Sequence, residues 1–233
     1  MKNLSNHWLL LFLAFFLLSS AKAQTNNQYK STSVTTTKTV EQPVAHPVAN
    51  SASKINPLLI GATIPEVKLK STDGKDVNLL DLVKNKPSVL IFYRGSWCPY
   101  CNAHLSQLRL IESQLVEMGY QLIAISPDSP EKLQENIDKN KLNYLLLSDS
   151  SASAATNFGI AFRVDDPTVE LYKKYNVDLE KISGENHHIL PVPSVFIVGT
   201  DGVIKFQYVN PNYKTRLSSD VILAAAKDLA PKN

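Results

Sequence analysis

The sequence contains two cysteines, Cys98 and Cys101, and both stand in one Cys-x-x-Cys motif. A disulfide between them closes so short a loop that it constrains the unfolded chain very little. The pair is therefore better explained by reactivity than by stability. Two neighbouring thiols can exchange with a disulfide, or reduce an oxidant through a sulfenic acid that the second thiol resolves.

The motif follows a predicted buried strand and opens a predicted helix. Residues 88–93 form a continuous apolar run, and apolar residues recur at helical spacing from 101 to 118. A helix N-terminus presents unpaired N–H groups and a positive dipole end, and both favour a thiolate. We therefore expect Cys98 to be exposed, to have a lowered pKa and to attack first, with Cys101 more buried and resolving.

Four neighbours are expected to support the cysteines. Pro99 lacks an N–H and suits the first helical position. Arg94 brings positive charge close to the thiols, and Trp97 and Tyr100 are expected to shape the access surface.

Metal and haem sites are weaker interpretations of the motif. Zinc would need two further ligands, and the available histidines are His104 and the pair His187-His188. We place His104 on the polar side of its helix and the pair in a solvated loop. A haem attachment motif needs His directly after Cys101, where Asn102 stands. No cofactor and no metal site are predicted.

The rest of the pattern predicts an α/β domain with an N-terminal β-hairpin and a central mixed sheet flanked by helices. The hairpin spans 67–79 around the Asp73-Gly74 turn. Residues 163–190 are interpreted as irregular, apart from one helix near 168–175. The other expected strands are 88–93, 121–125, 144–147, 193–198 and 203–209, and the other expected helices are 79–83, 98–117, 152–158, 219–229 and one that opens at Ser129-Pro130.

The N-terminal region predicts export. Lys2 precedes an apolar run at 9–18, and Ala21-Lys22-Ala23 is a cleavage pattern, so residues 1–23 are interpreted as a signal peptide. The mature protein is then periplasmic or extracellular, or membrane-tethered if the signal is retained. Residues 24–54 are polar and aperiodic and are interpreted as a flexible linker, which leaves 55–233 as one domain.

The charge of the chain excludes one class of partner. The formal net charge is +3, and loss of Lys2 and Lys22 with the signal leaves +1. Because so small a charge gives no polyanion-binding surface, nucleic acid is not an expected partner.

The motif and its surroundings resemble the thioredoxin fold, and within it the alkyl hydroperoxide reductase and thiol-specific antioxidant (AhpC/TSA) family. The sequence 97–101, Trp-Cys-Pro-Tyr-Cys, is similar to thioredoxin active sites, and Val192-Pro193 resembles the cis-proline that faces the dithiol and exposes backbone groups to a bound peptide. Residues 125–133, 147–149, 158–160 and 196–204 are similar to bacterioferritin-comigratory-type peroxiredoxins.

Two departures from the peroxiredoxin motif, Pro-x-x-x-Thr-x-x-Cys, matter for the chemistry. Aligned without a gap, the motif proline falls on Arg94, the threonine on Cys98 and the peroxide-reactive cysteine on Cys101. The usual active-site arginine before the late strand falls on Pro193. Peroxide reduction needs donors that stabilise the leaving oxygen. Because the alignment places the peroxide-reactive cysteine on Cys101, the resemblance also admits Cys101 as the attacking residue.

The resemblance implies an exported, thiol-dependent antioxidant oxidoreductase that reduces hydroperoxides and is recharged by an external, thioredoxin-like thiol donor. The alternative is a thiol–disulfide oxidoreductase acting on protein disulfides. A third and more remote alternative is a thioredoxin-fold copper chaperone, in which His187 or His188 would join the two cysteines.

Overall fold

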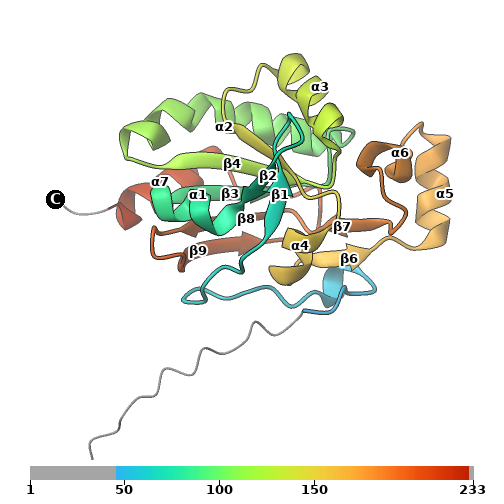
Figure 1. The fold of residues 1–233 in the computed structure, drawn as a ribbon, viewed down its shortest axis with the longest axis horizontal. Helices are drawn as coiled ribbons and strands as arrows, with labels where there is room; N and C mark the ends of the chain where they lie inside the picture. Colours follow the sequence, from blue (N-terminus) through green and yellow to red (C-terminus); the bar gives the residue numbers. More distant parts are fainter. Residues whose placement is uncertain (1–45, 231–233) are drawn as a thin grey trace, which may run out of the picture. The chain divides into compact units, whose positions relative to one another are not determined.

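A computed structural model describes residues 46–230 of the chain. A seven-stranded mixed sheet forms the centre, in the order β2-β1-β5-β4-β3-β8-β9 (Figure 1). Its strands are β1 (Lys68–Lys70), β2 (Asp76–Asn78), β3 (Ser88–Phe92), β4 (Gln121–Ser126), β5 (Leu145–Ser148), β8 (Ser194–Val198) and β9 (Ile204–Val209). This is the predicted thioredoxin-like α/β architecture with its N-terminal hairpin.

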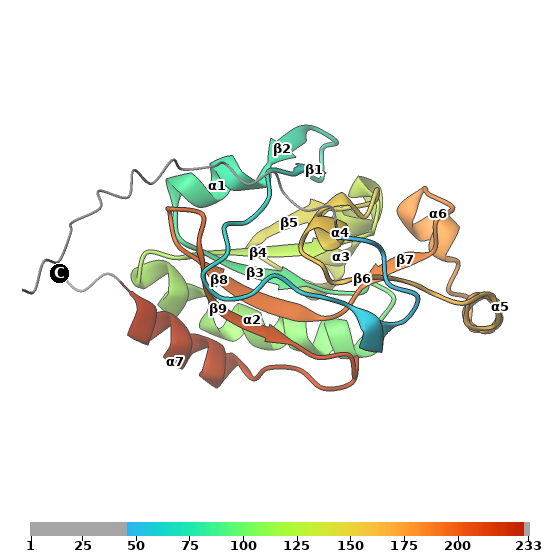
Figure 2. The ribbon, with the colours of Figure 1, turned by 90° about the horizontal axis from the view of Figure 1, so that it is seen from below.

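Helices cover both faces of the sheet (Figure 2). They are α1 (Leu79–Asn85), α2 (Pro99–Glu117), α3 (Pro130–Asn140), α4 (Ser153–Asn157), α5 (Asp166–Lys174), α6 (Leu179–Ser183) and α7 (Ser219–Leu229). In β3, Val89 and Ile91 pack with α2 and α7, whereas Leu90 and Phe92 face the core under α1 and α4. Because strand side chains alternate, one fully buried strand joins both cores and fixes where α2 begins.

Most helix starts follow the sequence signals. The side chain of Asn78 accepts from the backbone N–H of Leu80 at the start of α1. Ser129 caps α3, with Pro130 at the first position, and Ser218 caps α7. A side-chain oxygen at this position satisfies an N–H that the helix leaves unpaired. The caps therefore fix the residues at which α1, α3 and α7 begin.

Residues 161–191 are more regular than the irregular segment predicted at 163–190, although α5 confirms the helix expected near 168–175. They contain β6 (Ala161–Arg163), the helices α5 and α6, and β7 (Ile189–Pro191), which pairs antiparallel with β6. The two strands are too short to show a period in the sequence. The ribbon that they form carries α5 to the side of the sheet where β3 ends.

The expected linker boundary at residue 54 also differs from the structure. A short 3₁₀ helix at Ala52–Lys54 precedes the domain, and Ala49 exchanges backbone hydrogen bonds with the β6 strand. Its N–H donates to the Ala161 carbonyl at 3.0 Å, and its carbonyl accepts from Arg163 at 2.9 Å. Residues 49–54 therefore belong to the domain and not to a linker. The expectations for residues 1–45, including the signal peptide, lie outside the described residues.

None of the helices within residues 46–230 has both the length and the apolar character needed to cross a membrane.

We expect Gly159→Ala to destabilise the domain strongly, because this residue has a φ of +70° and a Cβ there would lie 1.9 Å from the Asn56 carbonyl oxygen. Backbone strain and overpacking together predict a loss of about 3 kcal/mol in the free energy of unfolding. Denaturant titration measures this loss.

The matched control is Gly74→Ala, which has a φ of +79° but no atom within 4 Å of the added Cβ. It carries only the backbone strain, about 1 kcal/mol. Equal losses for the two variants would show that the close approach to Asn56 does not matter.

Candidate active site

Cys98 lies at the predicted junction between strand and helix. It is the N-cap residue of α2, and Pro99 occupies the first helical position. Its carbonyl accepts the backbone N–H of Cys101 and of Asn102, each at 3.0 Å. The N–H of Cys98 donates to the Gly95 carbonyl at 3.2 Å, which turns the chain tightly from β3 into the helix. The motif is thus held by backbone geometry set up within a few residues.

The two thiols have opposite pKa shifts. Hydrogen bonding from the Cys101 side chain lowers the pKa of Cys98 to about 6, and the Cys101 N–H and the charges of Arg94 and Arg216 act in the same direction. Burial, together with the neighbouring Cys98, raises the pKa of Cys101 well above its usual range. Near neutral pH the reduced pair therefore holds a thiolate on Cys98 and a thiol on Cys101.

Cys98 is not exposed, in contrast to the expectation from the sequence. Its surface is 1% exposed and that of Cys101 is 0%. Residues 210–218, between β9 and α7, account for part of this burial. The Arg216 guanidinium donates to Cys101 Sγ at 3.3 Å, and the Tyr213 ring packs edge-on against Tyr100. Access to the sulfurs is therefore governed by residues far from the motif in sequence.

Arg94 is enclosed by aromatic rings, with 4% of its surface exposed. The guanidinium carbon lies 4.7 Å from the centre of the Trp97 ring, 5.6 Å from that of Tyr172 and 4.2 Å from that of Tyr213. The guanidinium also donates to the Tyr172 hydroxyl. Stacking on aromatic faces stabilises a desolvated cation. The expected positive charge is therefore a fixed one, in place to lower the pKa of Cys98.

The turn between Arg94 and Cys98 is anchored by Asp128, which follows β4. Its carboxylate accepts from the Ser96 N–H at 2.7 Å, and burial raises its pKa to about 6. Gly95 has a φ of +140°, and a Cβ there would lie 2.4 Å from Trp97 Nε1 and 2.8 Å from Asp128 Oδ1. Only glycine fits here, because the indole and the carboxylate converge on the space that a side chain would fill.

The histidines occupy different environments from those expected. His104 is buried on the inner side of α2, at 4% exposure, and burial lowers its pKa to about 4. His187 Nε2 lies 2.7 Å from the Ser150 carbonyl, and His188 Nε2 lies 2.8 Å from Glu180 Oε1. Within residues 46–230, no three His, Cys, Asp or Glu side chains are grouped closely enough to hold a metal ion.

Pro193 and Val192 lie beside Arg94 but do not offer free backbone groups. The Val192 N–H donates to the Ile160 carbonyl at 2.8 Å, and its carbonyl accepts from the Ser194 hydroxyl at 2.7 Å. The Pro193 carbonyl accepts from the Asn210 N–H at 3.3 Å. The expectation that this dipeptide exposes pairing groups to a bound peptide is therefore wrong for this structure.

Three functional neighbours could not be identified from the sequence. Tyr172 belongs to α5, and Tyr213 and Arg216 belong to the segment that precedes α7. No spacing rule connects them to residues 94–101, since only the tertiary fold brings them to the motif. Tyr172 lies within the helix predicted near 168–175, where its spacing does not single it out, and Tyr213 and Arg216 fall in no helical or strand pattern.

We expect removal of the Cys101 hydrogen bond to raise the pKa of Cys98 more than removal of any charge, since that bond is the largest cause of the shift. Cys101→Ala loses the donor, whereas Cys101→Ser keeps a hydroxyl donor and serves as the matched control. Ultraviolet absorbance of the thiolate against pH measures each pKa, and equal values for the two variants would contradict the assignment.

The same shift predicts a pH window for stability. Folding lowers the Cys98 pKa from 9.0 to about 6, so its stabilising contribution to the reduced protein is complete above pH 9 and lost as the pH falls through 6. Denaturant titrations should show this rise between pH 6 and 9 in the reduced protein, and a smaller rise in Cys98→Ser. An identical pH profile for the variant would argue against a thiolate on Cys98.

Known peroxiredoxins are similar to this chain in sequence. Peroxiredoxin Bcp of Escherichia coli K12 is 30% identical over 176 residues, which cover 76% of this chain and 100% of that protein. A 1-Cys peroxiredoxin of Hordeum vulgare is 26% identical, over 72% of this chain and 71% of its own length.

Solved structures with the same fold include the peroxidoxin BcpB of Mycobacterium tuberculosis, with a TM-score of 0.58 and 20% identity over 73% of this chain and 97% of its own. Reduced Prx3 of Vibrio vulnificus, solved with hydrogen peroxide, has a TM-score of 0.60 and 19% identity over 73% of this chain and 96% of its own. The AhpC/TSA family model matches residues 60–207. The chain thus belongs to the AhpC/TSA family, as a peroxiredoxin-like oxidoreductase of the thioredoxin fold.

Proposed function

We propose that this protein reduces hydroperoxides with Cys98 as the attacking sulfur and Cys101 as the resolving one. The observation that carries the proposal is the asymmetry of the pair: the pKa of Cys98 is lowered to about 6, while that of Cys101 is raised. A thiolate is the nucleophile in such reactions. Cys101, which stays protonated, reacts only after a sulfenic acid has formed on Cys98.

The reaction has two steps. The Cys98 thiolate attacks the terminal oxygen of R–O–O–H, the S–O bond forms as the O–O bond breaks, and the leaving RO⁻ takes a proton from water. Cys101 then attacks the Cys98 sulfenic acid, releasing water and forming the disulfide. The dithiol loses two electrons and the hydroperoxide gains them. A thioredoxin-like thiol donor, the kind of reductant expected for this family, then restores both thiols by exchange.

Two guanidinium groups supply the positive charge that is lost where the family's active-site arginine falls on Pro193. Arg94 and Arg216 both act on the Cys98 charge, and Arg216 also contacts Cys101 Sγ at 3.3 Å. Fixed cations in a site shielded from water stabilise the developing negative charge on the leaving oxygen. Arg94, just before the motif, and Arg216, from the segment before α7, thus support peroxide chemistry in place of the family arginine that falls on Pro193.

Exchange with protein disulfides is the second candidate. Tyr100, between the cysteines, is 42% exposed and offers a surface to a partner. Against this, Cys98 is 1% exposed and the backbone groups of Val192 and Pro193 are already paired. A small hydroperoxide needs less opening of the site than a polypeptide, so the geometry favours peroxide as the substrate.

We expect Cys101→Ser to react once with hydrogen peroxide and stop as a sulfenic acid, because the attacking sulfur remains and the resolving one is gone. Cys98→Ser should slow the first step on the order of 10³-fold or more, since the nucleophile is removed. Single-turnover kinetics with mass spectrometry measure both results.

A protein disulfide offered to the same reduced wild-type protein separates the two candidate functions. Faster reaction with the protein disulfide than with hydrogen peroxide would favour the second candidate. A rapid first step that survives in Cys98→Ser but not in Cys101→Ser would reverse the roles of the two sulfurs.

We also propose that the protein is exported. Lys2, the apolar run at 9–18 and the Ala21-Lys22-Ala23 pattern support this proposal. The chain expressed in full in a bacterial host should be recovered outside the cytoplasm, with Gln24 as its first residue. N-terminal sequencing checks the cleavage, and recovery of uncleaved chain from the cytoplasm would contradict it.

A further inference from the structure

The segment 210–218, between β9 and α7, contacts the dithiol but is lightly attached to the rest of the domain. Its residues 211–215 are exposed. In the part of the chain that the structure describes, the backbone of 211–216 makes hydrogen bonds only within 210–218; the Thr215 N–H, for example, donates to the Asn212 carbonyl at 3.0 Å. A segment with so few backbone ties to its surroundings opens locally at little cost in free energy.

Tyr213 joins this segment to the chain on both sides of Cys98. The centre of its ring lies 4.2 Å from the Arg94 guanidinium carbon, and the ring meets that of Tyr100 edge-on, with the two centres 5.8 Å apart. Arg94 precedes Cys98 in the sequence and Tyr100 follows it. The Tyr213 ring therefore bridges the residues that flank the attacking sulfur, and Cys98 itself is 1% exposed.

Arg216 holds the same segment from the side of Cys101. Its guanidinium donates to Cys101 Sγ at 3.3 Å and also to the Tyr213 carbonyl. Tyr213 thus contacts one cation of the site with its ring and the other with its backbone. Because the second contact does not involve the side chain, a change of the Tyr213 ring releases the segment from Arg94 and Tyr100 alone.

The ring of Tyr213 makes its contacts at the surface of the domain. The face of an aromatic ring attracts a cation, and aromatic pairs pack well edge to face. Tyr213 is 37% exposed and belongs to none of the hydrophobic clusters formed by residues 46–230. The ring can therefore move away from Arg94 and Tyr100 without disturbing the packing of the core.

We propose that Tyr213 is the gate of the dithiol, a specificity-determining residue that admits small hydroperoxides to Cys98 and excludes polypeptide disulfides while it is closed. The inference rests on the proposed function and adds what sets its selectivity. The closed ring covers the approach between Arg94 and Tyr100, so selection is by size and not by charge. A thioredoxin-like donor reaches the oxidised pair when the segment opens.

Two maleimides of different size test the gate without peroxide. N-ethylmaleimide and N-pyrenylmaleimide carry the same double bond; the Cys98 thiolate adds to one of its carbons, and the other takes a proton from water. Because both probes react with the same thiolate, a change in the pKa of Cys98 cancels in the ratio of their rate constants. We expect Tyr213→Ala to raise the ratio of the pyrenyl to the ethyl rate about tenfold, the factor that loss of one desolvated cation–π contact allows.

Tyr213→Phe is the matched control, because it keeps the ring and loses only the hydroxyl, and it should retain the wild-type ratio. Thr215→Ala, which changes an exposed residue of the same segment and keeps its backbone bonds, should retain it as well. Tyr213→Gln also removes the ring and should match Tyr213→Ala, so the test does not depend on the folding of one variant. An equal rise in Tyr213→Phe, or an unchanged ratio in both ring-free variants, would overturn the gate.

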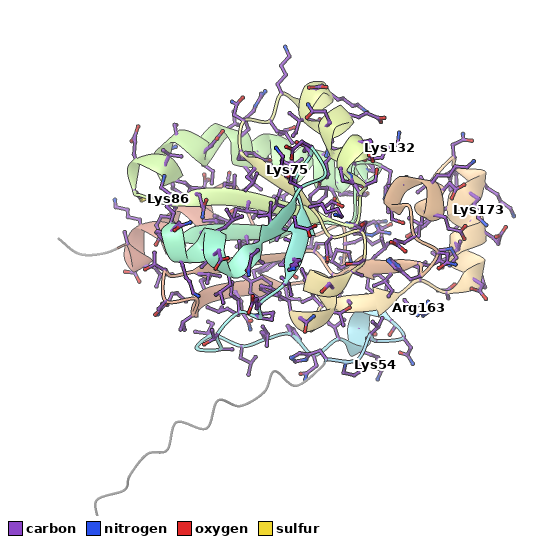
Figure 3. All side chains as sticks on the ribbon, in the orientation of Figure 1. Lys54, Lys75, Lys86, Lys132, Arg163 and Lys173 are labelled. Atoms are coloured by element: carbon purple, nitrogen blue, oxygen red, sulfur yellow. The ribbon has the colours of Figure 1, made fainter. Side chains whose placement is uncertain are left out.

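The position of each adduct has to be determined, because maleimides also react slowly with amines. Lys75, Lys86 and Lys173 are exposed at the surface (Figure 3) and compete for the probes. Peptide mass spectrometry identifies the adducts on Cys98, and Cys98→Ser gives the background rate to be subtracted.

Selectivity between oxidants links the gate to the proposed function. The rate of the reduced full chain with a protein disulfide, divided by its rate with hydrogen peroxide, should rise about tenfold in Tyr213→Ala and stay at the wild-type value in Tyr213→Phe. An unchanged quotient in Tyr213→Ala would overturn the gate as the determinant of selectivity. Failure of the wild-type chain to reduce any hydroperoxide would overturn the proposed function, and the maleimide ratio would still decide whether Tyr213 closes the site.

Discussion

A negative charge on a sulfur removed from water is the constraint on which this site depends. Cys98 has a pKa lowered to about 6 while 1% of its surface is exposed. A buried charge is costly unless hydrogen bonds and opposite charges surround it. The chain supplies them from two places: the side chain and the N–H of Cys101, one helical turn away, and the guanidinium groups of Arg94 and Arg216.

The buried charge of Arg94 likewise requires contacts, and it finds them in residues that are distant in the sequence. Being buried itself, it requires partners, and its partners are Trp97, Tyr172 of α5 and Tyr213 of the segment before α7. The β6–β7 ribbon explains how α5 comes to be there, because it turns the chain back toward the end of β3. Three segments spread over more than a hundred residues of the sequence thus fold around one cation.

The part of this arrangement that could be predicted is the part encoded locally. The apolar run of β3, the Cys-x-x-Cys motif and Pro99 are adjacent in sequence, so their strand–turn–helix geometry follows from short-range rules. The burial of Cys98 and the places of Tyr172 and Arg216 depend on segments that meet only in the folded chain. His104 shows the same limit, since α7 and the segment before it turn a helix face that looks polar into a buried one.

The placement of the Arg94 and Arg216 guanidinium groups around the Cys98 thiolate has an electrostatic consequence. In the reduced site, the Cys98 thiolate offsets one of the two guanidinium groups. A disulfide carries no charge. Oxidation therefore leaves both cations without that counter-ion and makes the net charge of the site more positive by one elementary charge. The electrostatic potential around the dithiol therefore differs between the oxidised and the reduced protein. An anionic thiol reductant is attracted more strongly to the oxidised form, which is the form that it reduces.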